Sequence, residues 1–469
     1  MRWFLIVVTL VRLVVAAEMP LSADEAYYRV WAHALAPGYL DHPPMVALWI
    51  RAGTALIGDT NLGIRLFGPL SALLGSLLLW RAGEDLAPGR GTGRRAVWLL
   101  NGTLLLNVGS VVMTPDTPLL LLWTASIAAL ARLLRTGKGA WWIAAGAAAG
   151  AAFDSKYTAI LLVPGVVAWL LAVPSMRFWL RRREFWAAAL VAVALATPVL
   201  LWNAEHDWAS FARQGGRAGD WHPSAAIRFF AELLLGQIGL ATPVLAVLFV
   251  VGIWRCVRAG VWRTPAAGLI AATTLVPLAV FLQHALGDRV QANWPAILFP
   301  GAALATAMTV QRFCRSGVAL GLGLSALVYL QATTALLDLP RRLDFSLIRL
   351  AGWGDLALAV EAARIAAGAD CVAADEYGLA VELAYRLPGP VLGAEPRWAL
   401  FGLPPAPASC ISVLLVRSAR RGALAPSGLW PELTPAGEVA RARGGIVAET
   451  YRLYRAPVPP GAVLLPARG

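Results

Sequence analysis

Between its first two apolar runs the chain carries Ser22-Ala23-Asp24-Glu25-Ala26-Tyr27-Tyr28, followed by Gly38-Tyr39-Leu40-Asp41-His42-Pro43-Pro44. These two segments gather carboxylates, tyrosines and a histidine in a chain of which only 14% is charged. Ionisable groups beside a bilayer are costly, so a cluster of them between membrane spans is a candidate functional site. The fold must therefore be one in which membrane helices present a polar loop.

The composition places this loop in a polytopic α-helical membrane protein. The chain has 469 residues, of which 58% are hydrophobic, and its mean hydropathy is +0.64. A net charge of +13 is compatible with nucleic-acid binding, but the basic residues gather in alternate loops, as the cytoplasmic loops of membrane proteins do. No nucleic-acid partner is needed to explain the charge.

The apolar residues form eleven runs, which we interpret as about eleven transmembrane helices. Several runs are shorter than the ~20 residues of a perpendicular span, so 141–173 is either one tight helical hairpin or a broken pair. The runs cover about 3–17, 62–80, 96–113, 118–135, 141–153, 157–173, 185–202, 230–252, 265–283, 293–310 and 317–335.

The charges of the connecting loops predict the orientation in a bacterial cytoplasmic membrane. Loops rich in arginine alternate with acidic loops, and Arg2 places the N-terminus inside. The acidic loops and the C-terminal tail are then extracytoplasmic. The first run also fits a signal peptide cleaved after Ala17, an alternative that leaves the first loop outside as well.

The hydropathy falls near Pro340, which predicts two domains: a transmembrane domain, 1–338, and an extracytoplasmic α/β domain, 339–469. Periodicity within the second domain predicts two helices and two strands, arranged as a parallel sheet would require. The helices are expected at 353–367 and 378–386, and the strands at 371–374 and 410–416. Cys371 and Cys410 each open a strand, so a disulfide forms if their Cα atoms lie within about 7 Å.

Asp24 and Glu25 have a structural and a functional interpretation. Following Ser22, a good capping residue, an acidic pair suits the first turn of a helix. Capping leaves Tyr27 and Tyr28 unexplained, and we therefore favour a functional role for the segment.

Asp41-His42 is the second candidate, because Pro43 and Pro44 fix the backbone at the start of a helix and aim the two preceding side chains. That helix, which ends near Ile57, is too short to cross and is expected along the outer interface. A rigidly held histidine beside a carboxylate suits contact with an anion or a divalent metal ion. The alternative is a simple turn with an exposed histidine.

Three further candidates lie at predicted outer ends of spans. Asp116, in Thr114-Pro115-Asp116-Thr117-Pro118, is either a turn residue or a carboxylate that points into a cavity. Lys156 and Arg289 are either snorkelling cations or contacts for the phosphate of a lipid. His222 belongs to an outer loop whose aromatic and polar residues suit either sugar recognition or a membrane interface.

The order of these motifs resembles the bacterial family 39 glycosyltransferases, relatives of protein O-mannosyltransferases and aminoarabinose transferases in the GT-C superfamily. The resemblance covers the membrane half strongly and the tail loosely. It is carried by Asp-Glu-Ala-Tyr-Tyr at 24–28, Gly-Tyr-Leu-Asp-His-Pro-Pro at 38–44, Thr-Pro-Asp-Thr-Pro at 114–118, Ser-Lys-Tyr at 155–157 and Asn-Trp-Pro at 293–295.

The resemblance implies transfer of a sugar from a polyprenyl-phosphate donor, outside the membrane and with inversion at the anomeric carbon. It carries the catalytic carboxylate over to Asp24, with Glu25 beside it. From their charge, Lys156, Arg289 and His42 are expected to contact the donor phosphate, because cations stabilise the charge that develops on it. Aminoarabinose transferases usually have Glu-Lys-Pro-Pro where this chain has Asp41-His42-Pro-Pro. A titratable histidine in place of a lysine changes the expected phosphate contact.

We therefore expect a membrane glycosyltransferase whose acceptor is a lipopolysaccharide or lipid, a cell-envelope glycan or a protein. No cofactor is required by the motifs, and a divalent metal ion near Asp41 and His42 remains an alternative. A transporter or lipid flippase is the competing class, because many spans and intramembrane charges describe those proteins too. Against it, the sequence has no internal repeat, and its charges cluster at one membrane face.

Overall fold

The computed structural model describes residues 1–469 except 220, 261–263, 423–426, 428 and 469, and it leaves the side chains of 217–219 undescribed. The described chain forms two compact units, each built from several segments. Unit 1 comprises Met1–Val14, Leu40–Val46 and Leu66–Leu327, and unit 2 comprises Val15–Tyr39, Ala47–Arg65 and Val328–Gly469. The predicted boundary between 1–338 and 339–469 stays a prediction.

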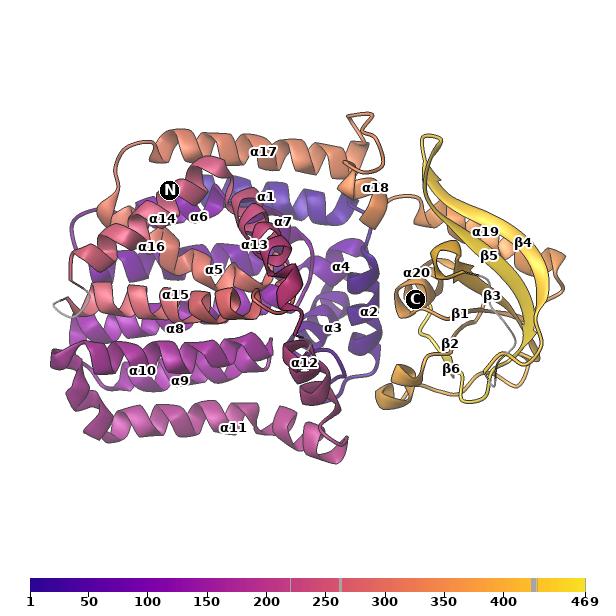
Figure 1. Ribbon diagram of the computed structural model, residues 1–469, viewed down its shortest axis with the longest axis horizontal. Helices are drawn as coiled ribbons and strands as arrows, with labels where there is room; N and C mark the ends of the chain where they lie inside the picture. Colours follow the sequence, from indigo (N-terminus) through magenta and orange to yellow (C-terminus); the bar gives the residue numbers. More distant parts are fainter. Residues whose placement is uncertain (220, 261–263, 423–426, 428, 469) are drawn as a thin grey trace. The chain divides into compact units, whose positions relative to one another are not determined.

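Helices make up most of the described chain (Figure 1). The α-helices are α1 (Arg2–Glu18), α2 (Ala23–His33), α3 (Met45–Ile57), α4 (Asn61–Arg65), α5 (Phe67–Leu86), α6 (Thr92–Asn101), α7 (Leu104–Val111), α8 (Asp116–Thr136), α9 (Ala140–Phe153), α10 (Leu162–Ala172), α11 (Arg183–Glu205), α12 (Ala209–Gly219), α13 (Ala226–Ala241), α14 (Pro243–Arg258), α15 (Pro265–His284), α16 (Leu298–Thr309), α17 (Cys314–Thr334), α18 (Phe345–Arg349), α19 (Trp353–Ala366) and α20 (Tyr377–Arg386). The 3-10 helices are η1 (Tyr157–Leu161), η2 (Pro174–Arg181), η3 (Pro223–Ala225), η4 (Trp294–Ile297), η5 (Pro396–Phe401) and η6 (Ala419–Arg421).

Most of the predicted apolar runs are helices, but two of them are broken. The run 96–113 divides into α6 and α7 because Thr103 caps a new helix, its hydroxyl accepting a hydrogen bond from the Leu106 amide. The run 230–252 divides into α13 and α14 at Thr242, whose positive φ of 73° ends one helix before Pro243 begins the next. In the region 141–173, residues 154–156 separate α9 from η1 and α10.

The described residues contain six helices that are long and apolar enough to cross a membrane, or up to eight if each of two bent pairs is one span. Three further apolar helices are shorter: Met45–Ile57, Ala140–Phe153 and Trp294–Thr309. The polytopic helical class is thus confirmed, whereas the count of eleven spans stays a prediction. The predicted helix after Pro44 is present as α3.

Unit 1 is a helical bundle in which α8 packs against α5 and α9, and α9 packs against α11 (Figure 1). Its interior also holds a polar network centred on Arg12 of α1, which is 1% exposed. The Arg12 guanidinium donates to the side-chain oxygens of Asn101 (3.0 Å) and Asn107 (2.8 Å), and Asn107 donates to Ser325 (3.0 Å). These contacts join α1 to α6 and α7, and α7 to α17.

Unit 2 combines α2, most of α3 and α4 with a six-stranded sheet in the order β4-β5-β3-β1-β2-β6. The sheet is mixed: β3, β1 and β2 are parallel, and the other neighbours are antiparallel. The strands are β1 (Cys371–Ala374), β2 (Val391–Gly393), β3 (Ser412–Ser418), β4 (Thr434–Arg443), β5 (Ile446–Pro457) and β6 (Val463–Leu464).

Both predicted helices and both predicted strands of the C-terminal domain are present as α19, α20, β1 and β3. The expectation of a parallel sheet is correct for the centre and wrong for the edges, where β4 and β5 form a long hairpin (Figure 1). The hairpin turns at Gly444 and Gly445, which both have positive φ. Cys371 and Cys410 are joined by a disulfide, with their Cα atoms 5.7 Å apart.

Candidate active site

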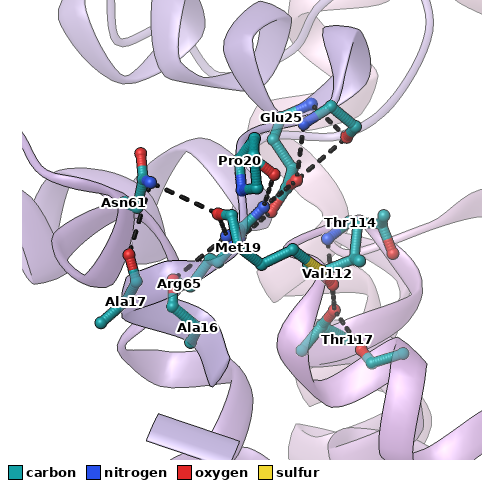
Figure 2. A network of polar contacts seen from close by, with 12 residues as sticks. Ala16, Ala17, Met19, Pro20, Glu25, Asn61, Arg65, Val112, Thr114 and Thr117 are labelled. Atoms are coloured by element: carbon teal, nitrogen blue, oxygen red, sulfur yellow. Dashed lines mark hydrogen bonds and ion pairs between the residues drawn. The ribbon is translucent and has the colours of Figure 1, made fainter. Parts of the chain in front are cut away.

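The acidic pair begins α2 in unit 2, and its two carboxylates have different surroundings. Glu25 completes a capping box, in which the Ser22 hydroxyl accepts from the Glu25 amide and the Glu25 carboxylate accepts from the Ser22 amide at 3.0 Å. Glu25 is fully buried and makes a two-pronged ion pair with Arg65, with distances of 2.6 and 2.7 Å. Figure 2 shows this carboxylate directed at the guanidinium.

Arg65 is also fully buried and joins Glu25 to the end of α1. Its terminal nitrogens donate to the backbone carbonyls of Ala16 (3.1 Å), Met19 and Pro20 (2.8 Å). Asn61 reinforces the same turn by donating to the carbonyls of Ala17 and Met19 (Figure 2). The structure therefore gives Glu25 a positioning role, which is the capping interpretation of this residue.

Asp24 is the exposed member of the pair. Its Oδ1 accepts a hydrogen bond from the hydroxyl of Tyr377, the first residue of α20, at 3.4 Å. A carboxylate that remains accessible is able to take a proton from a substrate hydroxyl. Of the two predicted catalytic acids, Asp24 is thus the one placed for proton transfer.

Tyr27 and Tyr28 are core residues of unit 2, exposed by 2% and 7%. Tyr27 packs against Tyr377, with ring centroids 4.6 Å apart, and its hydroxyl accepts from Arg397 at 3.2 Å. Tyr28 meets Trp31 edge to face at 4.9 Å. Tyr27 therefore fastens α2 to the C-terminal domain, whereas this contact of Tyr28 lies within α2. The burial of both residues supports a structural role.

Sequence reasoning also missed a buried arginine on α2. Arg29 is 1% exposed and pairs with Asp59, donating from Nε to Oδ1 at 2.9 Å. It also donates to the carbonyls of Pro466 (2.9 Å) and Ala467 (2.6 Å), near the end of the described chain. An arginine within Tyr-Tyr-Arg, next to an otherwise apolar face, was the available signal, but its partners are distant in sequence.

In unit 1 the structure brings Asp116 and Lys156 together. Lys156 Nζ lies 2.7 and 2.8 Å from the two oxygens of Asp116, and Asn293 donates to Asp116 at 2.5 Å. Asp116 is the first residue of α8, where a carboxylate also interacts favourably with the helix dipole. In the turn that includes Asp116, the Thr117 hydroxyl accepts a hydrogen bond from the Thr114 amide (Figure 2). Three predicted motifs thus meet at one buried ion pair.

The Asp41-His42-Pro43-Pro44 turn, also in unit 1, is held on two sides. Asp41 accepts from Arg213 Nε of α12 at 2.7 Å, and its carbonyl accepts from Gln214 at 2.6 Å. The Met45 amide, just after the turn, donates to the carbonyl of Asp154 at 3.0 Å. His42 is half-buried within this turn. The rigid presentation predicted from the two prolines is therefore present.

Arg289 and His222 lie on exposed loops of unit 1. The Arg289 guanidinium pairs with Glu232 at 2.7 Å while 59% of its side chain is exposed. The His222 amide donates to the carbonyl of Gly287 at 2.7 Å, which ties the two loops together. Arg289 thus remains accessible to an anion, and its role and that of His222 stay predictions.

Among the described residues, no group of three or more His, Cys, Asp or Glu side chains is arranged to hold a metal ion. A divalent metal ion near Asp41 and His42 stays a prediction.

Comparisons with known proteins find similarity to glycosyltransferases. The family model of the dolichyl-phosphate-mannose-protein mannosyltransferases matches residues 41–202. The lipid A galacturonosyltransferase RgtD of Rhizobium johnstonii is 26% identical over 378 residues, which cover 78% of this chain and 77% of that protein. Crystal structures of ArnT from Cupriavidus metallidurans, in the apo state and bound to undecaprenyl phosphate, align with a TM-score of 0.62 at 16% identity. The alignment covers 96% of this chain and 97% of ArnT.

The fold is therefore that of the GT-C glycosyltransferases, as the resemblance predicted. The chain is a membrane glycosyltransferase, a multi-pass protein of a bacterial inner membrane. This class replaces the transporter or flippase alternative.

Proposed function

We propose that this protein transfers a sugar from a polyprenyl-phosphate donor to lipid A or a related lipid on the extracytoplasmic face, with inversion and with Asp24 as the general base. The observation that carries this proposal is the contrast between the two acids of α2. Asp24 is exposed, whereas Glu25 is fully buried and paired with Arg65. The donor and acceptor classes are supported by the undecaprenyl phosphate bound to ArnT and by the lipid A named for RgtD.

The chemistry explains why a carboxylate is needed. An acceptor hydroxyl is a poor nucleophile, and a positioned base that removes its proton contributes about 10²- to 10⁴-fold to the rate. Attack on the anomeric carbon from the side opposite the phosphate breaks the bond to the lipid phosphate, which leaves with the electron pair. Asp24 takes the proton of the acceptor as the new glycosidic bond forms.

Cations in unit 1 are assigned to the leaving lipid phosphate. Lys156, Arg289 and His42 are the candidates, because fixed positive charge stabilises the negative charge that develops on the leaving oxygen. Lys156 is 5% exposed and held by Asp116, so it is oriented before the donor arrives. Arg289 is less enclosed, since 59% of its side chain is exposed.

The extracytoplasmic orientation is supported by the distribution of charge along the chain. Basic residues gather in one set of loops, including Arg177, Arg181, Arg182 and Arg183, whereas Asp24, Asp41 and Asp116 belong to the other set. The disulfide between Cys371 and Cys410 points to the same side, because such bonds persist in oxidising compartments.

Asp24→Asn is the direct test of the base. The protein is reconstituted into proteoliposomes with undecaprenyl phosphate that carries radiolabelled galacturonic acid, and purified lipid A is the acceptor. We expect Asp24→Asn to lower transfer by at least about 10²-fold. Asp355→Asn is the matched control, because Asp355 is also an exposed acid in the first turn of a unit 2 helix.

Full activity of Asp24→Asn would refute the assignment of the base. The donor and acceptor classes are tested separately, by mass spectrometry of lipid A and other envelope glycans from cells with and without the protein. A missing sugar on lipid A supports the proposed acceptor, whereas a loss confined to protein or wall glycans would contradict it.

A further inference from the structure

Tyr377 and Arg397, two residues of the C-terminal α/β domain, form a chain of contacts to the acid of the first loop. We infer that Tyr377, supported by Arg397, is a positioning residue that fixes Asp24 in its reactive orientation and in its ionised form. The inference rests on the proposed role of Asp24 as general base. It gives the C-terminal domain a defined part in the reaction, which neither the motifs nor the comparisons assign.

The sheet explains how these residues reach Asp24. Tyr377 follows β1 and opens α20, and Arg397 lies in η5, just after β2. β1 and β2 are parallel neighbours, so the segments that leave their carboxyl ends meet at the same edge of the sheet. The parallel strands thereby place Tyr377 and Arg397, which are 20 positions apart in the sequence, at the same edge of the sheet.

Close packing of α20 against α2 fixes the distance to Asp24. A Cβ atom at Gly378 would lie 3.3 Å from the Cβ of Ala23, so a glycine beside Tyr377 allows the two helices to approach. The Tyr377 hydroxyl then lies 3.4 Å from Asp24 Oδ1. A donor held on a rigid helix restricts the rotamers of the carboxylate, as an accurately placed base requires.

Arg397 orients and activates the tyrosine. Its guanidinium carbon lies 4.1 Å from the centroid of the Tyr377 ring, and only 12% of its side chain is exposed. It is fixed in turn by Tyr27, whose hydroxyl accepts from it at 3.2 Å. A cation over a phenol ring is attracted to the π-electrons and draws electron density from the ring, which makes the hydroxyl a better hydrogen-bond donor.

These contacts stabilise the charged form of the base. A hydrogen bond to a carboxylate favours ionisation, so its removal makes the acid harder to deprotonate. The rate of an enzyme that needs an ionised base falls at low pH with the protonation of that base. Loss of the Tyr377 hydroxyl should therefore move the acidic limb of the pH–rate profile to higher pH, an effect that a purely structural role does not produce.

Tyr377→Phe tests the inference. Transfer from radiolabelled undecaprenyl phosphate galacturonic acid to lipid A is measured from pH 4 to pH 9. We expect kcat at pH 6 to fall by about 3- to 10-fold, and the acidic limb to move up by about 0.5–1 pH unit, with an unchanged KM for the donor. Arg397→Gln should move the limb in the same direction by less, and it provides a second variant if the first is poorly folded.

Tyr385→Phe is the matched control, because Tyr385 is also on α20 and its hydroxyl donates to Asn61 at 3.0 Å, away from Asp24. A pH profile of Tyr377→Phe that coincides with those of Tyr385→Phe and the wild type would overturn the inference. If Asp24→Asn is inactive in the same assay, that outcome leaves the proposed function intact. Full activity of Asp24→Asn would overturn both.

Discussion

The buried pair of Glu25 and Arg65 provides the sharpest test of how the first loop is built. Both side chains are fully buried, and two short contacts of 2.6 and 2.7 Å join them. Arg65→Met removes the cation, keeps most of the volume and leaves the Glu25 carboxylate buried without its arginine. Breaking a buried ion pair by removing one partner typically costs about 3–5 kcal/mol.

Hydrogen exchange of the α2 amides in detergent micelles measures this loss locally. A loss of about 3–5 kcal/mol lowers protection by about 10²- to 10⁴-fold, since each tenfold change corresponds to about 1.4 kcal/mol. The double variant Glu25→Gln/Arg65→Met should recover much of the protection, because no unpaired charge then remains. The same hydrogen-exchange measurement separates a structural role from a catalytic one. Asp24→Asn should leave the protection of α2 within about threefold of the wild-type value, since substitutions at exposed positions rarely change stability by more than about 0.5 kcal/mol.

Two results would refute this reasoning. One is protection of α2 that is unchanged in Arg65→Met, which would mean that the pair contributes nothing to the loop. The other is a double variant as weak as the sum of the two single variants, which would mean that the residues act independently. If instead Glu25→Gln were well protected and inactive, the assignment of Glu25 to a positioning role would be wrong.

Three further predictions follow from other contacts. Lys156→Ala should raise the KM for the undecaprenyl-phosphate donor by about 10- to 100-fold, because a charge-assisted hydrogen bond contributes about 1.5–3 kcal/mol; an unchanged donor KM in folded protein would count against its role. Cys371→Ser/Cys410→Ser should destabilise the C-terminal domain by about 4 kcal/mol in denaturant titrations, given the sequence separation of 39; equal stability of the two forms would contradict this. Burial alone would raise the pKa of Asp59, but hydrogen bonds from His33 and Arg29 hold it well below the ordinary 3.8. Because the folded-state pKa is the lower one, the pairing stabilises unit 2 fully above about pH 3.8 and loses this stabilisation gradually as the pH falls from there through the folded-state pKa. The difference in melting temperature between wild type and Asp59→Asn should therefore be the same at pH 7 and pH 5 and should begin to shrink below pH 3.8; a difference that stays constant down to pH 2 would exclude the linkage.

The class and the main elements were predictable because they depend on local pattern. Apolar runs predict membrane helices, and alternation of short strands with helices predicted β1, β3, α19 and α20 at their observed positions. The breaks at Thr103 and Thr242 were predictable too, since a capping threonine after Gly102 and a Thr-Pro pair are local signals. The hairpin of β4 and β5 was missed because its burial is weak and its residues mix charges with apolar groups.

The partners of the site residues were not predictable in the same way. Glu25 meets Arg65 40 positions away, and Asp24 meets Tyr377 353 positions away. A single sequence contains no signal for such pairings, because they are decided by tertiary packing. Lys156 and Asp116 were each identified as candidates, whereas their direct ion pair appears only in the folded chain.

The hydrogen bonds from Arg29 to the carbonyls of Pro466 and Ala467 have a consequence for the order in which this part of the protein forms during synthesis. Arg29 is synthesised early, whereas Pro466, whose carbonyl accepts one of its hydrogen bonds, is synthesised 437 positions later. At about 5–20 residues per second, this interval lasts roughly 20–90 s. During that time Arg29 already has Asp59 in the chain as a partner, but the two carbonyls that bind it in the folded protein have not yet been synthesised.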